Sequence, residues 1–197
     1  MRTIWVFDID STVANNNARA ALLQKRCNVC LYSPCPIGVG NACPNCGGDS
    51  FVFSQESWDT FLDTSLIAKD TPIVGAVRVL TLLREQNQDI CFLTGRNEGL
   101  RQVTESWLLN HAGWQSDKEP LLMRPMEETG LSASIYKERQ LQRYLSTLPD
   151  KPFLVFFEDD PHVFNVYSKH GLVIRCPEAW QHFAPPGGAG TELAYNR

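Results

Sequence analysis

The feature that most constrains the fold is a short apolar run at residues 4–7, which is followed by two aspartates, Asp8 and Asp10. Four bulky apolar residues in a row are typical of a buried strand. In open α/β sheets, sites form just outside the carboxyl ends of the strands. Neighbouring carboxylates repel each other and need a cation, and Mg²⁺ suits them because it prefers oxygen ligands. The alternative interpretation is an acidic turn without a chemical role.

Apolar runs alternate with helical patterns along the rest of the chain. Strands are expected at residues 89–94, 121–124, 153–157 and 172–174, and helices at 70–86, at 135–148 and ending near residues 111 and 170. The helix at 70–86 is expected to begin with Asp70 as a cap and Pro72 in its first turn. Its expected buried residues are Val74, Val77, Leu80 and Leu83. Strands that alternate with helices predict an α/β fold with a mostly parallel sheet covered on both faces.

Polar residues follow the long strands at the points where they end. Thr94 and Arg96 come at the end of the strand at 89–94, and Asp159 and Asp160 follow the strand at 153–157. The carboxyl ends of parallel strands meet at one edge of a sheet. We therefore expect these side chains to lie close to the two aspartates of the first strand.

Length and charge narrow the class of protein. A chain of 197 residues can bury one good-sized core with room for a small insertion. The net charge of −4 argues against tight, sequence-independent binding to duplex DNA, which needs a basic face. No apolar run reaches the length of a membrane span, and the N-terminus lacks a signal-peptide pattern, so a cytoplasmic protein is expected.

The cysteines form a metal-binding pattern. The chain has seven cysteines, and two Cys-x-x-Cys pairs, Cys27/Cys30 and Cys43/Cys46, lie 12 residues apart. This spacing predicts a structural Zn²⁺ site with four thiolate ligands, in a reducing compartment. Cys35 lies between the pairs and is either spare or a substitute ligand. The alternative is two unrelated thiol pairs.

Four motifs give the chain a family resemblance. Residues 8–12 read Asp-Ile-Asp-Ser-Thr, with Ser11 where glycine is usual, Thr94 ends a strand, Lys137 lies on a helix, and residues 159–160 are an acidic pair. In this order they resemble the haloacid dehalogenase-like (HAD) phosphatases, and the resemblance implies a Rossmann-like α/β core with a cap. Lys137 could instead be a solvated helix residue, with nearby Arg139 as the cation.

A closer likeness is to the phosphatase domain of bacteriophage polynucleotide kinases and its stand-alone relatives. It is carried by Trp58-Asp59-x-Phe61, Asp70-x-Pro72, Thr94-Gly95-Arg96-Asn97-Glu98, Thr104-x-x-Trp107-Leu108 and Leu121-Leu122-Met123-Arg124-Pro125. The chain departs from those relatives at residues 132–136, which lack their acidic and basic run. It also shows no Gly-rich phosphate loop ending in Gly-Lys-Ser/Thr, so a kinase half is not expected in it. The expected organisation is a phosphatase core at 1–26 and 51–185 with a helical cap at 54–68, a zinc insertion at 27–50 and a flexible tail at 186–197.

The resemblance implies a role for each motif. Asp8 would attack phosphorus to form an aspartyl-phosphate, and Asp10 would protonate the leaving oxygen and then activate water. Thr94 and Lys137 would hold the phosphate oxygens. The ligands of Mg²⁺ would be Asp8, the main-chain carbonyl of Asp10, and the acidic pair Asp159 and Asp160.

Arginines near the strand ends are candidate substrate-binding residues. Arg96 and Arg124 carry guanidinium groups that suit phosphate or nucleobase edges, and the alternative for each is a salt bridge to a nearby helix. Arg19, in the segment after the first motif, is a further candidate, and so is Gly95 beside Arg96.

Together with the resemblance, these features predict a Mg²⁺-dependent phosphomonoesterase that acts on a nucleotide or on the 3′-phosphate end of a polynucleotide. The likeness to bacteriophage enzymes implies that a phage could encode the protein. One alternative is a phosphatase for mononucleotides or sugar phosphates that does not bind nucleic acid, which the acidic charge favours. Another is a catalytically silent binding module stabilised by zinc. The zinc insertion is expected to form or support a lid that selects the substrate.

Overall fold

The computed structural model describes residues 2–23, 25–31, 43–48, 51–53 and 55–176. Cys35 and the expected tail at 186–197 lie outside these residues, as does the end of the expected core at 177–185. Among the described residues, no helix combines the length and the apolar character needed to cross a membrane.

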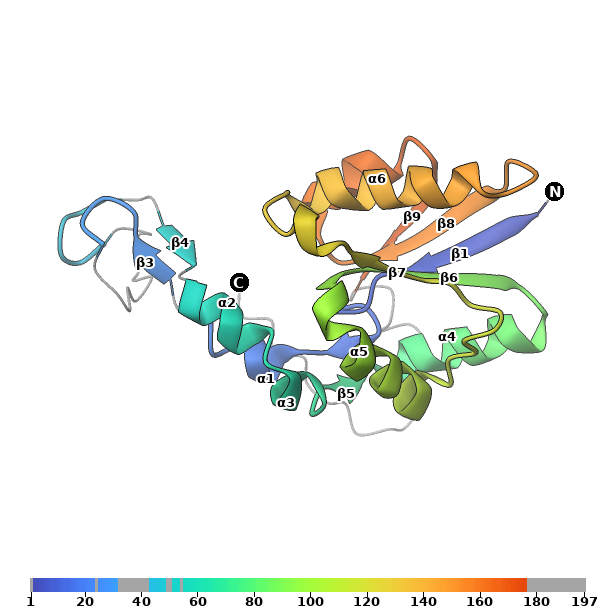
Figure 1. The fold of residues 1–197 in the computed structure, drawn as a ribbon, viewed down its shortest axis with the longest axis horizontal. Coiled ribbons are helices and arrows are strands. Elements are labelled where there is room, and N and C mark those ends of the chain that lie inside the picture. The colour runs from blue at the N-terminus through green and yellow to red at the C-terminus, as the bar shows by residue number, and fades with distance from the viewer. Residues whose placement is uncertain (1, 24, 32–42, 49–50, 54, 177–197) are drawn as a thin grey trace.

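A five-stranded sheet forms the centre of the molecule (Figure 1). Its spatial order is β7 (Leu121–Arg124), β6 (Asp89–Asn97), β1 (Thr3–Phe7), β8 (Phe153–Glu158) and β9 (Gly171–Arg175). All neighbouring strands pair in parallel, with Phe7 opposite Phe92 on one side and opposite Phe157 on the other. The predicted parallel α/β fold is therefore confirmed, and the carboxyl ends of β1, β6 and β8 meet at one edge.

Helices cover both faces of the sheet (Figure 1). One face is covered by α6 (Ala133–Ser146) and α7 (Pro161–Tyr167), whose Leu141, Val163 and Tyr167 pack with the buried residues of β1 and β8. The opposite face carries α4 (Val74–Glu85), α5 (Arg101–Trp107) and the π-helical turn at Leu108–Ala112. Short 3₁₀ turns span Glu98–Leu100 and Met126–Glu128. Each of the two hydrophobic cores thus lies between one face of the sheet and the helices that cover that face.

The start of α4 differs from the prediction. Thr71–Pro72 forms a short strand, β5, that pairs with β2 (Ala14–Asn15), so the helix begins only at Val74. A residue before proline favours extended backbone, and the Ile73 amide donates to the Val13 carbonyl at 2.8 Å. The helix therefore buries Ala76, Val79 and Leu80, whereas Val74 is 61% exposed.

An insertion lies between β2 and β5. It contains α1 (Asn17–Ala20), the antiparallel hairpin of β3 (Lys25–Cys27) and β4 (Phe51–Phe53), α2 (Gln55–Phe61) and α3 (Thr64–Ile67). The hairpin extends beyond α2 at the end of the molecule opposite the N-terminus (Figure 1). Because β3 begins at Lys25, the hairpin begins two residues before the expected boundary of the zinc segment. The expected helical cap at 54–68 corresponds to α2 and α3.

Candidate active site

Strand pairing brings Asp8 to the centre of the carboxyl edge. Asp8 follows β1, and its main-chain amide donates to the Phe157 carbonyl of β8 at 3.0 Å. The neighbouring strand β6 carries Thr94, whose side chain is fully buried. Asp8 is itself only 5% exposed. Strands β1, β6 and β8 therefore contribute their polar ends to one place, as the sequence predicts.

Lys137 reaches this place from α6. Its Nζ donates to Asp8 Oδ1 at 2.9 Å and to Glu158 Oε2 at 2.7 Å, and the residue is 3% exposed. Arg139, the alternative cation, has a side chain that is 53% exposed and lies 3.8 Å from Glu128. Of the two candidate cations, the structure brings Lys137 to Asp8.

Three acidic side chains form a cluster around Lys137. Carboxylate oxygens of Asp8, Glu158 and Asp159 lie within 4.8 Å of one another. Asp160 is not in this cluster, because its carboxylate accepts a hydrogen bond from the His162 amide at 2.9 Å and caps α7. The acidic set thus differs from the predicted one by Glu158 in place of Asp160. The signal for Glu158 was the run of three acids at the end of β8.

The acidic cluster is electrostatically unfavourable without a cation. Burial raises the pKa of Asp8 well above its usual value, against the effect of Lys137, and Glu158 raises it further. Burial and then Glu158 likewise raise the pKa of Asp159 to about 7. Burial opposes the charge of Lys137, but Asp8 and Glu158 outweigh it and raise the pKa of the ammonium well above its usual value. One lysine therefore faces three acids.

Asp10 lies in a second cluster, with arginines. Arg96 donates from Nη2 to Asp10 Oδ1 at 2.8 Å and from Nε to Oδ2 at 3.1 Å, and Arg19 Nη2 also donates to Oδ1. Both arginines are about 1% exposed. Burial tends to raise the pKa of Asp10, but Arg96 and then Arg19 outweigh it and lower the pKa to about 2. The arginines thus favour the ionised form of Asp10, whereas burial and the neighbouring acids shift the pKa of Asp8 in the opposite direction.

Asp70 completes the second cluster and was missed by the sequence reasoning. Arg19 Nε donates to both of its carboxylate oxygens at 3.0 Å, and Arg96 Nη2 donates to Oδ2 at 3.1 Å. Its main-chain carbonyl accepts from Trp107 Nε1 at 2.7 Å. Burial raises the pKa of Asp70, against the effect of Arg19. The expectation that Asp70 caps a helix is wrong, because β5 keeps the chain extended and turns Asp70 inward as a counter-ion.

The turn after Asp10 is tight. Ser11, at the position where the resemblance leads one to expect glycine, has a φ of 60°, in the left-handed region that favours glycine. Its hydroxyl donates to Asn16 Oδ1 at 2.9 Å. The turn leads the chain into α1, which returns Arg19 to Asp10.

The candidate substrate-binding residues have diverse surroundings. The guanidinium groups of Arg19 and Arg96 are occupied by Asp10 and Asp70. Arg96 therefore forms salt bridges, but with aspartates that lie outside helices rather than with the nearby helix of the alternative interpretation. The guanidinium of Arg124 lies 4.1 Å from the centre of the Tyr136 ring. A Cβ atom on Gly95 would meet no described atom closer than 3.6 Å.

Helix α2 contacts the second cluster. Arg19 Nη1 donates to the Phe61 carbonyl at 3.0 Å, and its guanidinium lies 4.1 Å from the centre of the Phe61 ring. Trp58 packs edge-on against Phe61 and against Phe53 of the hairpin. A continuous row of aromatic contacts therefore connects the hairpin to the partner of Asp10.

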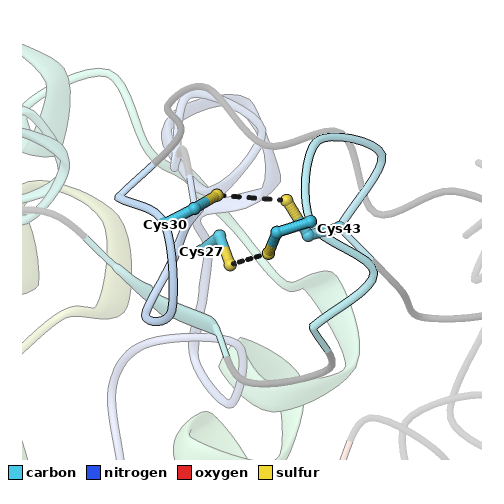
Figure 2. A group of neighbouring side chains, drawn as sticks. Cys27, Cys30 and Cys43 are labelled. Carbon is cyan, nitrogen blue, oxygen red and sulfur yellow. Dashed lines mark hydrogen bonds between the residues drawn. The ribbon is translucent and has the colours of Figure 1, made fainter.

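The four predicted zinc ligands lie together on the hairpin. Figure 2 shows Cys27, Cys30 and Cys43 directed toward one another, and Cys46 completes the group. The Sγ atoms of Cys27 and Cys46 are 3.5 Å apart, and those of Cys30 and Cys43 are 3.7 Å apart. Four thiolates at Zn–S distances of about 2.3 Å in a tetrahedron would be roughly 3.8 Å apart. The residues therefore fit a tetrahedral zinc ion.

A family model matches the chain. It describes the HAD superfamily, subfamily IIIB (acid phosphatase), and it matches residues 42–147, more than half of the chain. The match includes Thr94 and Lys137, whereas Asp8 and Asp10 precede it. Among curated proteins, none matches the sequence.

Solved structures share the fold. A chain of the Pnkp1/Rnl/Hen1 complex superposes with a TM-score of 0.55 at 17% identity, over 89% of this chain and 46% of its own length. A haloacid dehalogenase-like family hydrolase from Streptococcus pneumoniae superposes with a TM-score of 0.56 at 11% identity, over 88% of this chain and 84% of its own. The present chain thus spans slightly less than half of the length of the matched chain in the Pnkp1 complex.

Proposed function

The chain belongs to the HAD superfamily and is a phosphoric monoester hydrolase, and from this premise we propose that Asp8 is its nucleophile and that its substrate is a nucleotide or the 3′-phosphate end of a polynucleotide. The observation that carries the proposal is the position of the buried Asp8 carboxylate, at the carboxyl edge of the sheet and bonded to Lys137 at 2.9 Å. Carboxylate nucleophiles that form aspartyl-phosphates are an established solution for phosphoryl transfer.

In the first step, Asp8 attacks the phosphorus atom. Its Oδ1 accepts from Lys137, so we assign the attack to Oδ2. The new Asp8–O–P bond forms as the bond from phosphorus to the leaving oxygen breaks, and the leaving oxygen takes a proton from Asp10. The positive charge of Lys137 stabilises the negative charge that gathers on the phosphoryl oxygens.

In the second step, water attacks the phosphorus atom of the aspartyl-phosphate. Asp10 accepts the proton of the water, inorganic phosphate is released, and the Asp8 carboxylate is restored. The ionised form of Asp10, held by Arg19 and Arg96, suits this step directly. For the first step, an anionic phosphate bound beside Asp10 adds negative charge, which favours the protonated acid.

The acidic cluster fits a magnesium ion. Asp8, Glu158 and Asp159 supply oxygen donors within 4.8 Å of one another, and ligands on opposite sides of Mg²⁺ are about 4.2 Å apart. These residues, with the main-chain carbonyl of Asp10, would hold the ion. When bound, it supplies positive charge to the phosphate oxygens.

A structural zinc ion at Cys27, Cys30, Cys43 and Cys46 is the second proposed metal. Four thiolate ligands leave no open position, so this site would stabilise the hairpin rather than take part in chemistry. Metal analysis should find one zinc per chain, and Cys46→Ser should lose it. Cys91→Ala, which alters a buried cysteine of the central sheet, should retain the zinc. A zinc content near zero in the unaltered protein would refute this site.

The substrate class rests on the sequence motifs shared with polynucleotide kinase phosphatases. The fold shared with a chain from an RNA repair complex is consistent with it. The net charge of −4 favours the second candidate, a mononucleotide phosphatase. Arg26 of the hairpin is exposed.

The test is a screen of phosphate release from mononucleotides, sugar phosphates and 3′- or 5′-phosphorylated oligonucleotides, with and without Mg²⁺. Release from 3′-phosphorylated oligonucleotides, with an affinity that falls steeply as salt increases, would support the polynucleotide substrate. A flat salt dependence together with efficient mononucleotide hydrolysis would support the small substrate. Asp8→Asn serves to exclude contaminating phosphatases, and Asp117→Asn, an exposed aspartate, is its matched control.

A further inference from the structure

Tyr136 is a buried tyrosine in the first turn of α6 whose hydroxyl lacks a partner. The residue is 0% exposed, and its Oη has no hydrogen-bond partner within the described part of the chain. Buried polar groups in folded proteins are nearly always hydrogen-bonded, because an unpaired one loses its hydration without compensation. The position of this hydroxyl therefore calls for a physical explanation.

The hydroxyl lies against the carboxyl-terminal part of the long strand β6. A Cβ atom placed on Gly95 would lie 3.6 Å from Tyr136 Oη, so the hydroxyl adjoins the main chain next to Thr94. The next residue of the helix, Lys137, contacts Asp8 and Glu158. The Tyr136 hydroxyl thus lies where the helix that supplies the lysine of the active site meets the Thr94–Gly95 segment of β6.

The surroundings of Tyr136 hold its ring in place. They also keep its hydroxyl protonated, so that it can donate a hydrogen bond. The guanidinium of Arg124 lies over the ring at 4.1 Å, and Arg124 Nη1 donates to the Thr129 carbonyl at 3.2 Å. Arg124 Nε is likewise buried without a hydrogen-bond partner among the described residues. Burial raises the pKa of Tyr136, so the phenol keeps its proton at neutral pH.

We propose that the Tyr136 hydroxyl donates a hydrogen bond to a non-bridging oxygen of the substrate phosphate, which makes Tyr136 a further binding residue of the active site. An anionic acceptor suits this place because the donor is buried and the neighbouring cations, Lys137 and Arg124, favour negative charge. The inference rests on the proposed function, since it assigns the phosphate to the space between Asp8 and the Thr94–Gly95 segment of β6.

The test is Tyr136→Phe, which removes only the hydroxyl. A hydrogen bond to a charged phosphate oxygen implies a loss of about 10- to 100-fold in kcat/KM. Inorganic phosphate should also inhibit Tyr136→Phe more weakly than it inhibits the unaltered enzyme. The melting temperature without ligand should stay the same or rise, because the substitution removes an unpaired buried hydroxyl. A stable protein with impaired phosphate binding is the expected result.

Tyr144→Phe is the matched control. Tyr144 lies on the same helix and is half-buried, but it faces Cys91, Arg2 and Asp89, at the amino end of the sheet. This control should leave kcat/KM within about twofold of the unaltered enzyme.

Two results would overturn the inference. One is unchanged kcat/KM and phosphate inhibition in Tyr136→Phe. The other is a fall in melting temperature with activity lost in proportion to the folded fraction, which would assign the hydroxyl a structural role. If the unaltered protein hydrolyses no phosphate ester, the proposed function fails. Calorimetric titration of both proteins with inorganic phosphate still tests Tyr136 in that case.

Discussion

Asp8 and Asp10 are two residues apart and chemically identical, yet the structure places them in opposite surroundings. Asp8 shares one lysine with two other acids, and burial raises its pKa well above the usual value. Asp10 is held by two arginines, which lower its pKa to about 2 despite burial. The comparison teaches that the cations around each of two buried carboxylates decide in which direction its pKa shifts.

The largest expected effect comes from replacing Asp8 and Asp10 separately, because the two aspartates are assigned different chemical roles. Asp8→Asn should abolish turnover of p-nitrophenyl phosphate and form no phosphoenzyme. Asp10→Asn should lower kcat by about 10²- to 10⁴-fold, because it removes the base that activates water. Its phosphoenzyme should accumulate, since p-nitrophenolate leaves without a proton.

Mass spectrometry of acid-quenched samples measures the phosphoenzyme of each variant. Phosphoenzyme in Asp8→Asn, or equal behaviour of both variants, would contradict the assignment of Asp8 as nucleophile.

The next effect concerns the cation beside Asp8. Lys137→Met leaves Asp8 and Glu158 buried without their shared ammonium, and the free energy of unfolding should fall by about 3–5 kcal/mol in the absence of divalent cations. Urea denaturation measures this, and added Mg²⁺ should restore part of the loss by binding the folded state. Arg139→Met, with an exposed side chain, should cost less than about 1 kcal/mol. Similar losses in both variants would contradict the role given to Lys137.

The third effect concerns the cations beside Asp10. Arg96→Met removes the guanidinium shared by Asp10 and Asp70 and should lower the free energy of unfolding by about 3 kcal/mol. Arg101→Met removes two ion pairs whose side chains are more than a third exposed, and it should cost about 0–1 kcal/mol. Thermal and urea unfolding of the pair provide the measurement. An equal loss in the free energy of unfolding for Arg96→Met and Arg101→Met would mean that burial does not strengthen the ion pairs of the second cluster.

The smallest expected effect concerns Asp70, the counter-ion of Arg19 and Arg96. Asp70→Asn keeps an oxygen acceptor for Arg19 and leaves both arginines on Asp10, so we expect a loss of about 1–2 kcal/mol in stability and less than a tenfold loss in kcat. Asp89→Asn, which alters an exposed pair with Arg2, is the control and should be nearly neutral. A loss of kcat as large as that of Asp10→Asn would instead make Asp70 part of the chemistry.

Much of the fold follows from local patterns. The apolar strands and their alternation with helices predict the parallel sheet, and the sheet confirms it. The convergence of Asp8 and Thr94 could be predicted because parallel strands end at a common edge. The grouping of the four cysteines could be predicted because zinc ligands keep a short spacing along the chain. Errors arose where a short-range signal competed with pairing between distant segments, as at Asp70, where β5 replaces the expected helix start.

The sequence by itself determined the family, the order along the chain of the five central strands and of the main helices, and the edge of the sheet where polar residues gather. These depend on side-chain period and on residues close together in the chain. Only the tertiary structure decided that Lys137 joins Asp8, that Arg19 and Arg96 share Asp10 with Asp70, and that Glu158 rather than Asp160 faces inward. These contacts join residues far apart along the chain, and their geometry depends on how helices dock on the sheet, which no local pattern specifies.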